Sequence, residues 1–213
     1  MCGTFTSDFG KRKGEEVDTR ILGYLSIGIG AVAYAFYYRG IFAKTNPTRP
    51  HIFTWLAWTI AIGFVFFAQV REGAGAGAWA TGFTAINCVA VTIIAFFRGE
   101  KDIAWTDWVC FIGAIIGILY WRITFGLVVP IIILCISDVL AFIPTYRKDY
   151  LKPNEDTALA FALNSLKFCV ALLALDSWSI ATALFPATLV FDNALCCGII
   201  LFRRWYLRLK QNK

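Results

Sequence analysis

Long apolar segments alternate with short charged segments along the whole chain, and this alternation constrains the fold more than any other feature. About 20 apolar residues in a helix, rising 1.5 Å per residue, span the hydrocarbon core of a bilayer. In lipid every backbone polar group must be bonded inside the segment, so each run is expected to be a helix. The sequence therefore predicts an all-α membrane protein with seven transmembrane helices, at residues 21–38, 52–70, 78–97, 105–121, 124–143, 157–175 and 179–202.

Composition also favours lipid over water. Hydrophobic residues make up 59% of the 213 residues and charged residues only 16%, which is more apolar surface than one soluble core can bury. The net charge of +6 would suggest nucleic acid for a soluble protein, but here Lys and Arg stand at the ends of apolar runs, where they face headgroups. We expect the bilayer, and no nucleic acid, as a partner; a homo-oligomer is compatible with the sequence.

The basic residues predict an orientation in the membrane. The first apolar run follows a charged segment and is long enough to span, so we expect an uncleaved anchor in the cell (inner) membrane. Seven spans put the two termini on opposite sides. Six basic residues then lie on the N-terminal side and thirteen on the other, with Lys167 inside a run. By the positive-inside rule the N-terminus faces outside and the C-terminus faces the cytoplasm.

Chemistry-bearing residue types are scarce. Six of the seven cysteines lie inside apolar runs, where a thiol behaves as a small hydrophobe, so no disulfide framework is expected. One histidine, His51, and no CxxC pair make a zinc site improbable. No Ser, His and Asp set suggests hydrolysis. The sequence therefore predicts a protein that is not an enzyme and that has no cofactor and no metal.

An internal repeat is visible at an offset of 106 residues. This shift places residues 86–98 on residues 192–204, with Asn87 on Asn193, and it also places Pro47 on Pro153. Three runs repeated after one extra helix have the same orientation in both copies, as in transporters whose solute path lies between two halves. We therefore expect a 3+1+3 parallel repeat of three-helix bundles. Its predicted parts are an extracytoplasmic segment 1–20, a first repeat 21–97, a linker helix 98–123, a second repeat 124–202 and a basic cytoplasmic tail 203–213.

Two local patterns predict how neighbouring elements join. Gly113 and Gly117 form a small-xxx-small pattern that permits close helix contact. Residues 144–153, which contain three basic residues and begin and end with proline, are expected to form a hinge-like cytoplasmic loop with snorkelling charges.

Four polar residues are predicted to lie at one depth. Counted at 1.5 Å per residue, Lys167, Asp192 and Asn87 each lie about 15 Å from the cytoplasmic end of a run, and Asn193 is adjacent to Asp192. Unpaired charges are costly there, so Lys167 and Asp192 are expected to form an ion pair. The two asparagines can donate and accept hydrogen bonds to a polar solute. The alternative is that all four groups satisfy one another as interhelical contacts.

Three further residues are candidates for the same solute. Asp138 and Asn164 lie nearer the cytoplasmic face and are expected to line an inner vestibule. Trp58, at the start of its run, offers a ring for stacking, although packing against lipid or helices would explain it equally well. The predicted substrate-binding set is thus Asn87, Asn193, Asp192, Lys167, Asn164, Trp58 and Asp138.

The arrangement resembles the SWEET and PQ-loop superfamily of sugar transporters, and the vitamin permeases of the nicotinamide riboside type look similar in architecture. The resemblance comprises seven helices as three, one and three, an outside N-terminus, and Asn87 and Asn193 in the third and seventh runs. It implies that these asparagines line the central solute site. The chain departs from the pattern because it has no Pro-Gln dipeptide and because Pro47 and Pro153 precede their runs.

The leading expectation is therefore a transporter or facilitator of a small polar solute such as a sugar, a nucleoside or a vitamin. A receptor or sensor on the same fold, which binds a ligand without transport, is the main alternative. A retinal protein is disfavoured, because its lysine would be expected on the last helix and Lys167 lies on the sixth.

Overall fold

The computed structural model describes residues 18–44, 49–99, 105–154 and 157–211. Most of the predicted N-terminal segment and Pro47, which the repeat alignment used, lie outside these residues. The described chain forms seven α-helices and one 3₁₀ turn, and it contains no strand. The elements are α1 (Thr19–Ile41), α2 (Ile52–Arg71), η1 (Gly75–Ala78), α3 (Trp79–Arg98), α4 (Trp105–Thr124), α5 (Val128–Leu151), α6 (Ala158–Leu173) and α7 (Ile180–Gln211).

Five segments are long and apolar enough to cross a membrane: α1, α2, η1 with α3, α5 and α7. Helix α4 has 20 residues, as many as α2 and α3. Helix α6 has 16 residues, which is below the usual length of a spanning helix. Large apolar side chains such as Phe36, Ile86 and Leu173 are exposed on the outer surface, where they would contact lipid. These features fit a multi-pass integral membrane protein.

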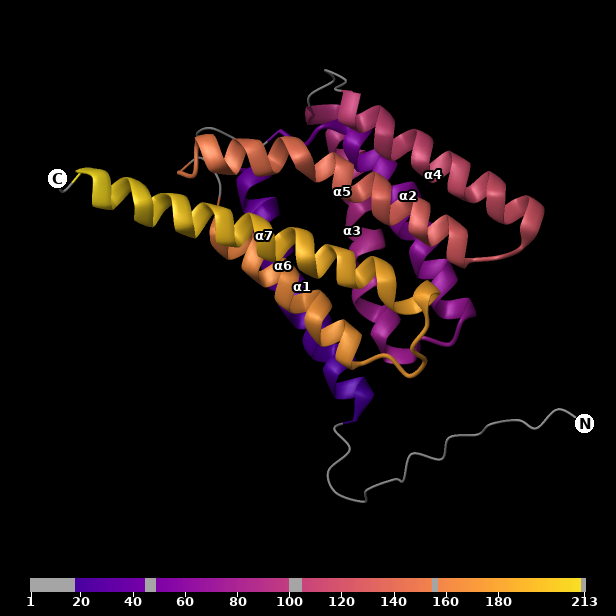
Figure 1. Cartoon of the computed structure of the whole chain (residues 1–213). Coiled ribbons are helices and arrows are strands. Elements are labelled where there is room, and N and C mark those ends of the chain that lie inside the picture. The colour runs from indigo at the N-terminus through magenta and orange to yellow at the C-terminus, as the bar shows by residue number, and fades with distance from the viewer. Residues whose placement is uncertain (1–17, 45–48, 100–104, 155–156, 212–213) are drawn as a thin grey trace, which may run out of the picture.

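The helices pack in a definite order (Figure 1). Helix α3 contacts both α1 and α2, and α7 contacts both α5 and α6. The first and last groups meet where α1 packs on α6 and where α2 contacts α7. Helix α4 packs on α5 and α2, on the side of the bundle away from α1 and α6.

Small residues allow the helices to approach closely. Ala57, Ala68, Ala80 and Ala114 are fully buried, and small side chains at helix contacts are typical of membrane proteins, where backbones approach without a large apolar core. The predicted close contact of the Gly113 pattern is confirmed, because a Cβ atom at Gly113 would overlap the Ser137 side chain of α5. The face of α4 with Gly113 and Gly117 therefore packs directly on α5.

Replacing Gly113 with leucine should separate α4 from α5, because the Ser137 side chain occupies the space that the leucine side chain needs. We expect a loss of about 1–3 kcal/mol in stability, typical of overpacking, measured by thermal unfolding in detergent. Gly198→Leu is the control, since Gly198 is exposed on α7 and a Cβ atom there meets nothing within 4 Å. Equal effects of the two substitutions would contradict the close contact.

Helices α5 and α7 extend well beyond their predicted C-terminal ends. Helix α5 begins at Val128, four residues after the predicted start, and continues to Leu151, so the expected hinge-like loop at 144–153 is wrong. Helix α7 continues to Gln211 through most of the predicted tail. The extensions support each other, because Arg203 Nε of α7 donates a hydrogen bond to the Tyr150 carbonyl oxygen of α5 and its guanidinium stacks on the Tyr150 ring.

Candidate functional site

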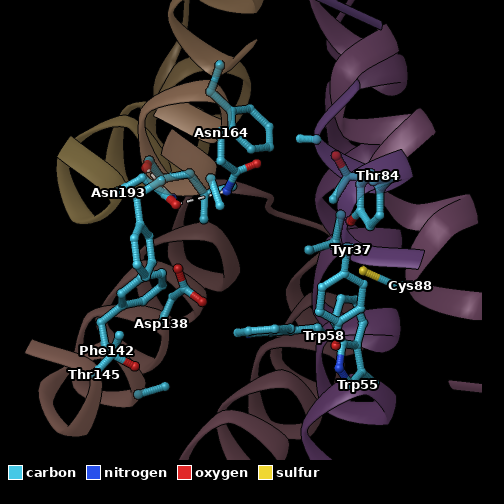
Figure 2. A pocket seen from close by; sticks show the side chains of 18 residues that line it. Tyr37, Trp55, Trp58, Thr84, Cys88, Asp138, Phe142, Thr145, Asn164 and Asn193 are labelled. Carbon is cyan, nitrogen blue, oxygen red and sulfur yellow. Dashed lines mark hydrogen bonds between the residues drawn. The ribbon is translucent and has the colours of Figure 1, made fainter. Parts of the chain in front are cut away.

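A cavity of about 400 Å³ lies among six of the helices. Figure 2 shows side chains of α5, α6 and α7 on one side and side chains of α1, α2 and α3 on the other. Among the described residues, none of α4 contributes to the lining. The lining residues are Ala33, Tyr34, Tyr37, Trp55, Trp58, Ile62, Thr84, Cys88, Asp138, Ala141, Phe142, Thr145, Ala160, Phe161, Asn164, Phe168, Leu189 and Asn193.

Aromatic rings form much of the wall on the α1–α3 side. The ring centroids of Tyr37 and Trp55 are 5.3 Å apart, and those of Trp55 and Trp58 are also 5.3 Å apart with the rings nearly perpendicular. Edge-to-face contacts of this kind hold each ring in one orientation. The ring of Trp58 extends toward the opposite wall (Figure 2), where it is available to stack on a ligand.

Two amide side chains meet on the opposite wall. Asn164 Nδ2 of α6 donates a hydrogen bond of 3.0 Å to Asn193 Oδ1 of α7, and Asn193 Nδ2 donates to the Leu189 carbonyl oxygen. These bonds fix both amides at the cavity. Within the described part of the chain the carbonyl oxygen of Asn164 has no hydrogen-bond donor, so it can accept one from a bound solute.

Asp138 of α5 places a carboxyl group in the same wall. Its side chain is 5% exposed, and its Oδ2 atom is buried without a hydrogen-bond partner among the described residues. The Trp58 indole N–H of α2 donates a hydrogen bond to this carboxyl group. Four predicted site residues, Asp138, Trp58, Asn164 and Asn193, are thus brought together at one cavity.

Asp192 does not line the cavity, contrary to the prediction. It is completely buried on α7, and its Oδ1 atom accepts a hydrogen bond of 2.6 Å from the Tyr146 hydroxyl of α5. Consecutive helical residues point about 100° apart. When Asn193 faces the cavity, Asp192 therefore faces α5.

The predicted ion pair of Lys167 with Asp192 is wrong. Lys167 is 1% exposed, and its Nζ atom donates a hydrogen bond of 3.0 Å to Thr84 Oγ1 of α3. The ammonium group also lies 4.2 Å from the centre of the Phe168 ring and 5.7 Å from that of Tyr34. Lys167 faces α1 and α3, while Asp192 faces α5, because the two helices turn these side chains to different sides. Lys167 lies behind the cavity wall and does not line it.

Asn87 is also outside the lining, so the expectation that it shares the cavity with Asn193 is wrong. The Tyr38 hydroxyl donates a hydrogen bond of 2.9 Å to Asn87 Oδ1, and Asn87 Nδ2 donates to the Phe83 carbonyl oxygen. The next residue, Cys88, lines the cavity instead. Asn87 therefore joins α3 to α1.

Several lining residues were not predicted. Tyr34 and Tyr37 stand one helical turn apart on α1, and Phe142 and Thr145 do the same on α5. A spacing of three places side chains on one helix face, but in helices this rich in aromatic residues the spacing does not distinguish a cavity face from a lipid face. No group of three His, Cys, Asp or Glu residues that could hold a metal ion occurs within the described ranges.

Comparison of the chain with protein-family models, curated proteins and solved structures gives no match. The functional argument therefore depends on the geometry of the cavity.

Proposed function

We propose that the chain is a seven-helix membrane transporter or facilitator, in which a small polar solute passes through the cavity between two three-helix units, α1–α3 and α5–α7. Helix α4 is the linker that gives the two units the same orientation. In this proposal α4 and the shorter helix α6 also cross the membrane, the N-terminus lies outside and the C-terminus lies in the cytoplasm, as the distribution of Lys and Arg favours.

The positions of the lining residues carry the proposal. On α2 the cavity is lined by Trp55, Trp58 and Ile62, and on α6 by Phe161, Asn164 and Phe168, among others. Each α6 residue stands 106 positions after its α2 counterpart, which is the offset at which the sequence repeats. Two equivalent helix faces thus meet at one cavity, as expected for a solute path between two repeats.

The lining residues of the third helices, α3 and α7, are related by nearly the same offset in the sequence. Thr84 and Cys88 of α3 and Leu189 and Asn193 of α7 line the cavity at an offset of 105. In each unit the third helix contacts the other two. One residue more or less between the second and third helices would account for the change from 106 to 105, and it explains why Asn193 reaches the cavity while Asn87 does not.

The lining suits a solute with a flat or apolar body and several polar groups. Aromatic rings offer stacking surfaces, and Asn164, Asn193 and Thr145 offer hydrogen bonds. A cavity of about 400 Å³ is within the size range of small-molecule sites. Sugars, nucleosides and vitamin-like compounds meet this description, and SWEET-like carriers of the same expected architecture transport such solutes.

A thermal-shift screen of the purified chain tests this function first. A ligand that binds only the folded state raises its apparent stability, so at least one compound of a sugar, nucleoside and vitamin panel should raise the midpoint. The compound found should then enter proteoliposomes that contain the protein faster than protein-free liposomes. Binding without any uptake would favour a receptor or sensor.

Matched asparagine variants locate the path. Asn193→Ala should weaken solute binding about tenfold, as loss of an amide contact of 1–1.5 kcal/mol implies. Asn87→Ala should leave binding unchanged, because Asn87 bonds only to Tyr38 and Phe83. Both comparisons use equal amounts of folded protein. If Asn87→Ala weakened binding and Asn193→Ala did not, the solute would use a different path.

A further inference from the structure

Asp138 is a carboxyl group without a counter-charge. It is buried in the cavity wall, and one of its two oxygens has no hydrogen-bond partner in the described chain. Asp192 of α7 is close enough to interact electrostatically with Asp138, and its Oδ2 atom is also unpartnered among the described residues. Two neighbouring carboxyl groups therefore lie at this wall, and no basic side chain among the described residues is bonded to either of them.

The buried lysine does not neutralise these groups. Lys167 donates to Thr84 and lies against the Phe168 ring. Thr84 and Phe168 both line the cavity on the side that Lys167 occupies, and in Figure 2 Thr84 lies across the cavity from Asp138. The cavity therefore has a carboxyl group at its Asp138 end and a buried lysine behind its other end.

Aromatic rings complete the Asp138 end of the cavity. The Trp58 indole N–H donates to Asp138, and Trp55 and Tyr37 continue the same wall (Figure 2). The face of an aromatic ring attracts a cation, most strongly in tryptophan. A carboxyl group at the edge of a tryptophan ring, next to the ring face, is suited to a weakly hydrated positive group.

We propose that the solute is a small organic cation, a protonated amine or a quaternary ammonium compound, whose charged group lies beside Asp138 and over the face of the Trp58 ring. This inference rests on the proposed function and narrows its solute class. The uncharged body of the solute points toward Thr84, because Lys167 would repel a positive group at that end. Binding supplies the counter-charge that the protein lacks at Asp138, and the same charge distribution disfavours anionic solutes.

Two pairs of probes with matched shape test the charge requirement. Choline is compared with its neutral isostere 3,3-dimethylbutan-1-ol, and tyramine with its neutral isostere 4-propylphenol, by calorimetry on the full chain in detergent. At least one cation should bind about tenfold more tightly than its neutral partner, as expected for a charge-assisted contact. Asp138→Asn should abolish this preference. Asp176→Asn, at an exposed position after α6, should preserve it.

Trp58→Leu provides a second test if Asp138→Asn does not yield folded protein. Loss of the ring should weaken binding of the cation more than binding of its neutral partner. Equal affinity within both pairs, failure of both cations to bind, or an unchanged preference in Asp138→Asn would overturn the cation assignment. If a neutral solute still crossed through the cavity, the proposed function would stand with a different solute. If no compound bound and none was transported, both proposals would fall.

Discussion

Tryptophan in place of Ala33 is expected to reduce solute flux about tenfold or more while the protein remains folded. Ala33 lines the cavity from α1, and an indole in its place would occupy the space that the solute needs. Ala141→Trp on α5, at the opposite wall, should have the same effect, because in the proposed function both walls border one solute path.

Ala35→Trp is the matched control, since Ala35 lies two residues away on α1 and is exposed. Flux is measured in proteoliposomes that contain equal amounts of folded protein. If the Ala33 and Ala35 variants transported equally well, the cavity would not be the solute path. If flux fell equally in both, the effect would come from perturbation of α1 and not from the cavity.

Glutamate in place of Lys167 is expected to destabilise the protein by about 3–5 kcal/mol, the cost of an uncompensated buried charge. The lysine ammonium lies near the faces of Phe168 and Tyr34, which attract a cation and repel an anion. The Thr84 hydroxyl cannot help a carboxylate, because it already donates to the Ala80 carbonyl oxygen and only accepts from Lys167.

Lys167→Met separates loss of the charge from its reversal. Methionine fills similar space without a charge, and no carboxylate depends on Lys167, so we expect a change of less than about 1.5 kcal/mol. Thermal unfolding in detergent and the yield of folded protein measure both variants. A methionine variant as unstable as the glutamate variant would mean that a buried anion needs the lysine, as the predicted pair with Asp192 required.

Which segments form helices in lipid follows largely from local sequence. The start of α2 at Ile52 and the start of α4 at Trp105 agree with the predictions, because apolar length and flanking charges are properties of the segment itself. The ends of α5 and α7 were predicted less well. Those ends depend on the contacts of Tyr146 with Asp192 and of Arg203 with Tyr150, which join residues about 50 positions apart.

The candidate site also has some features that follow from the sequence and others that depend on the tertiary structure. Depth along each helix can be counted from the sequence at 1.5 Å per residue, so polar residues buried in the apolar runs, Asn193 and Asp138 among them, were identified before their surroundings were known. The direction in which each side chain points was decided only by the tertiary structure. Helices that are apolar on all sides have no polar face to mark the inward direction. Packing of small residues between neighbouring helices therefore sets the rotation of each helix, and that rotation turns Asn193 into the cavity, Asn87 toward Tyr38 and Lys167 away from Asp192.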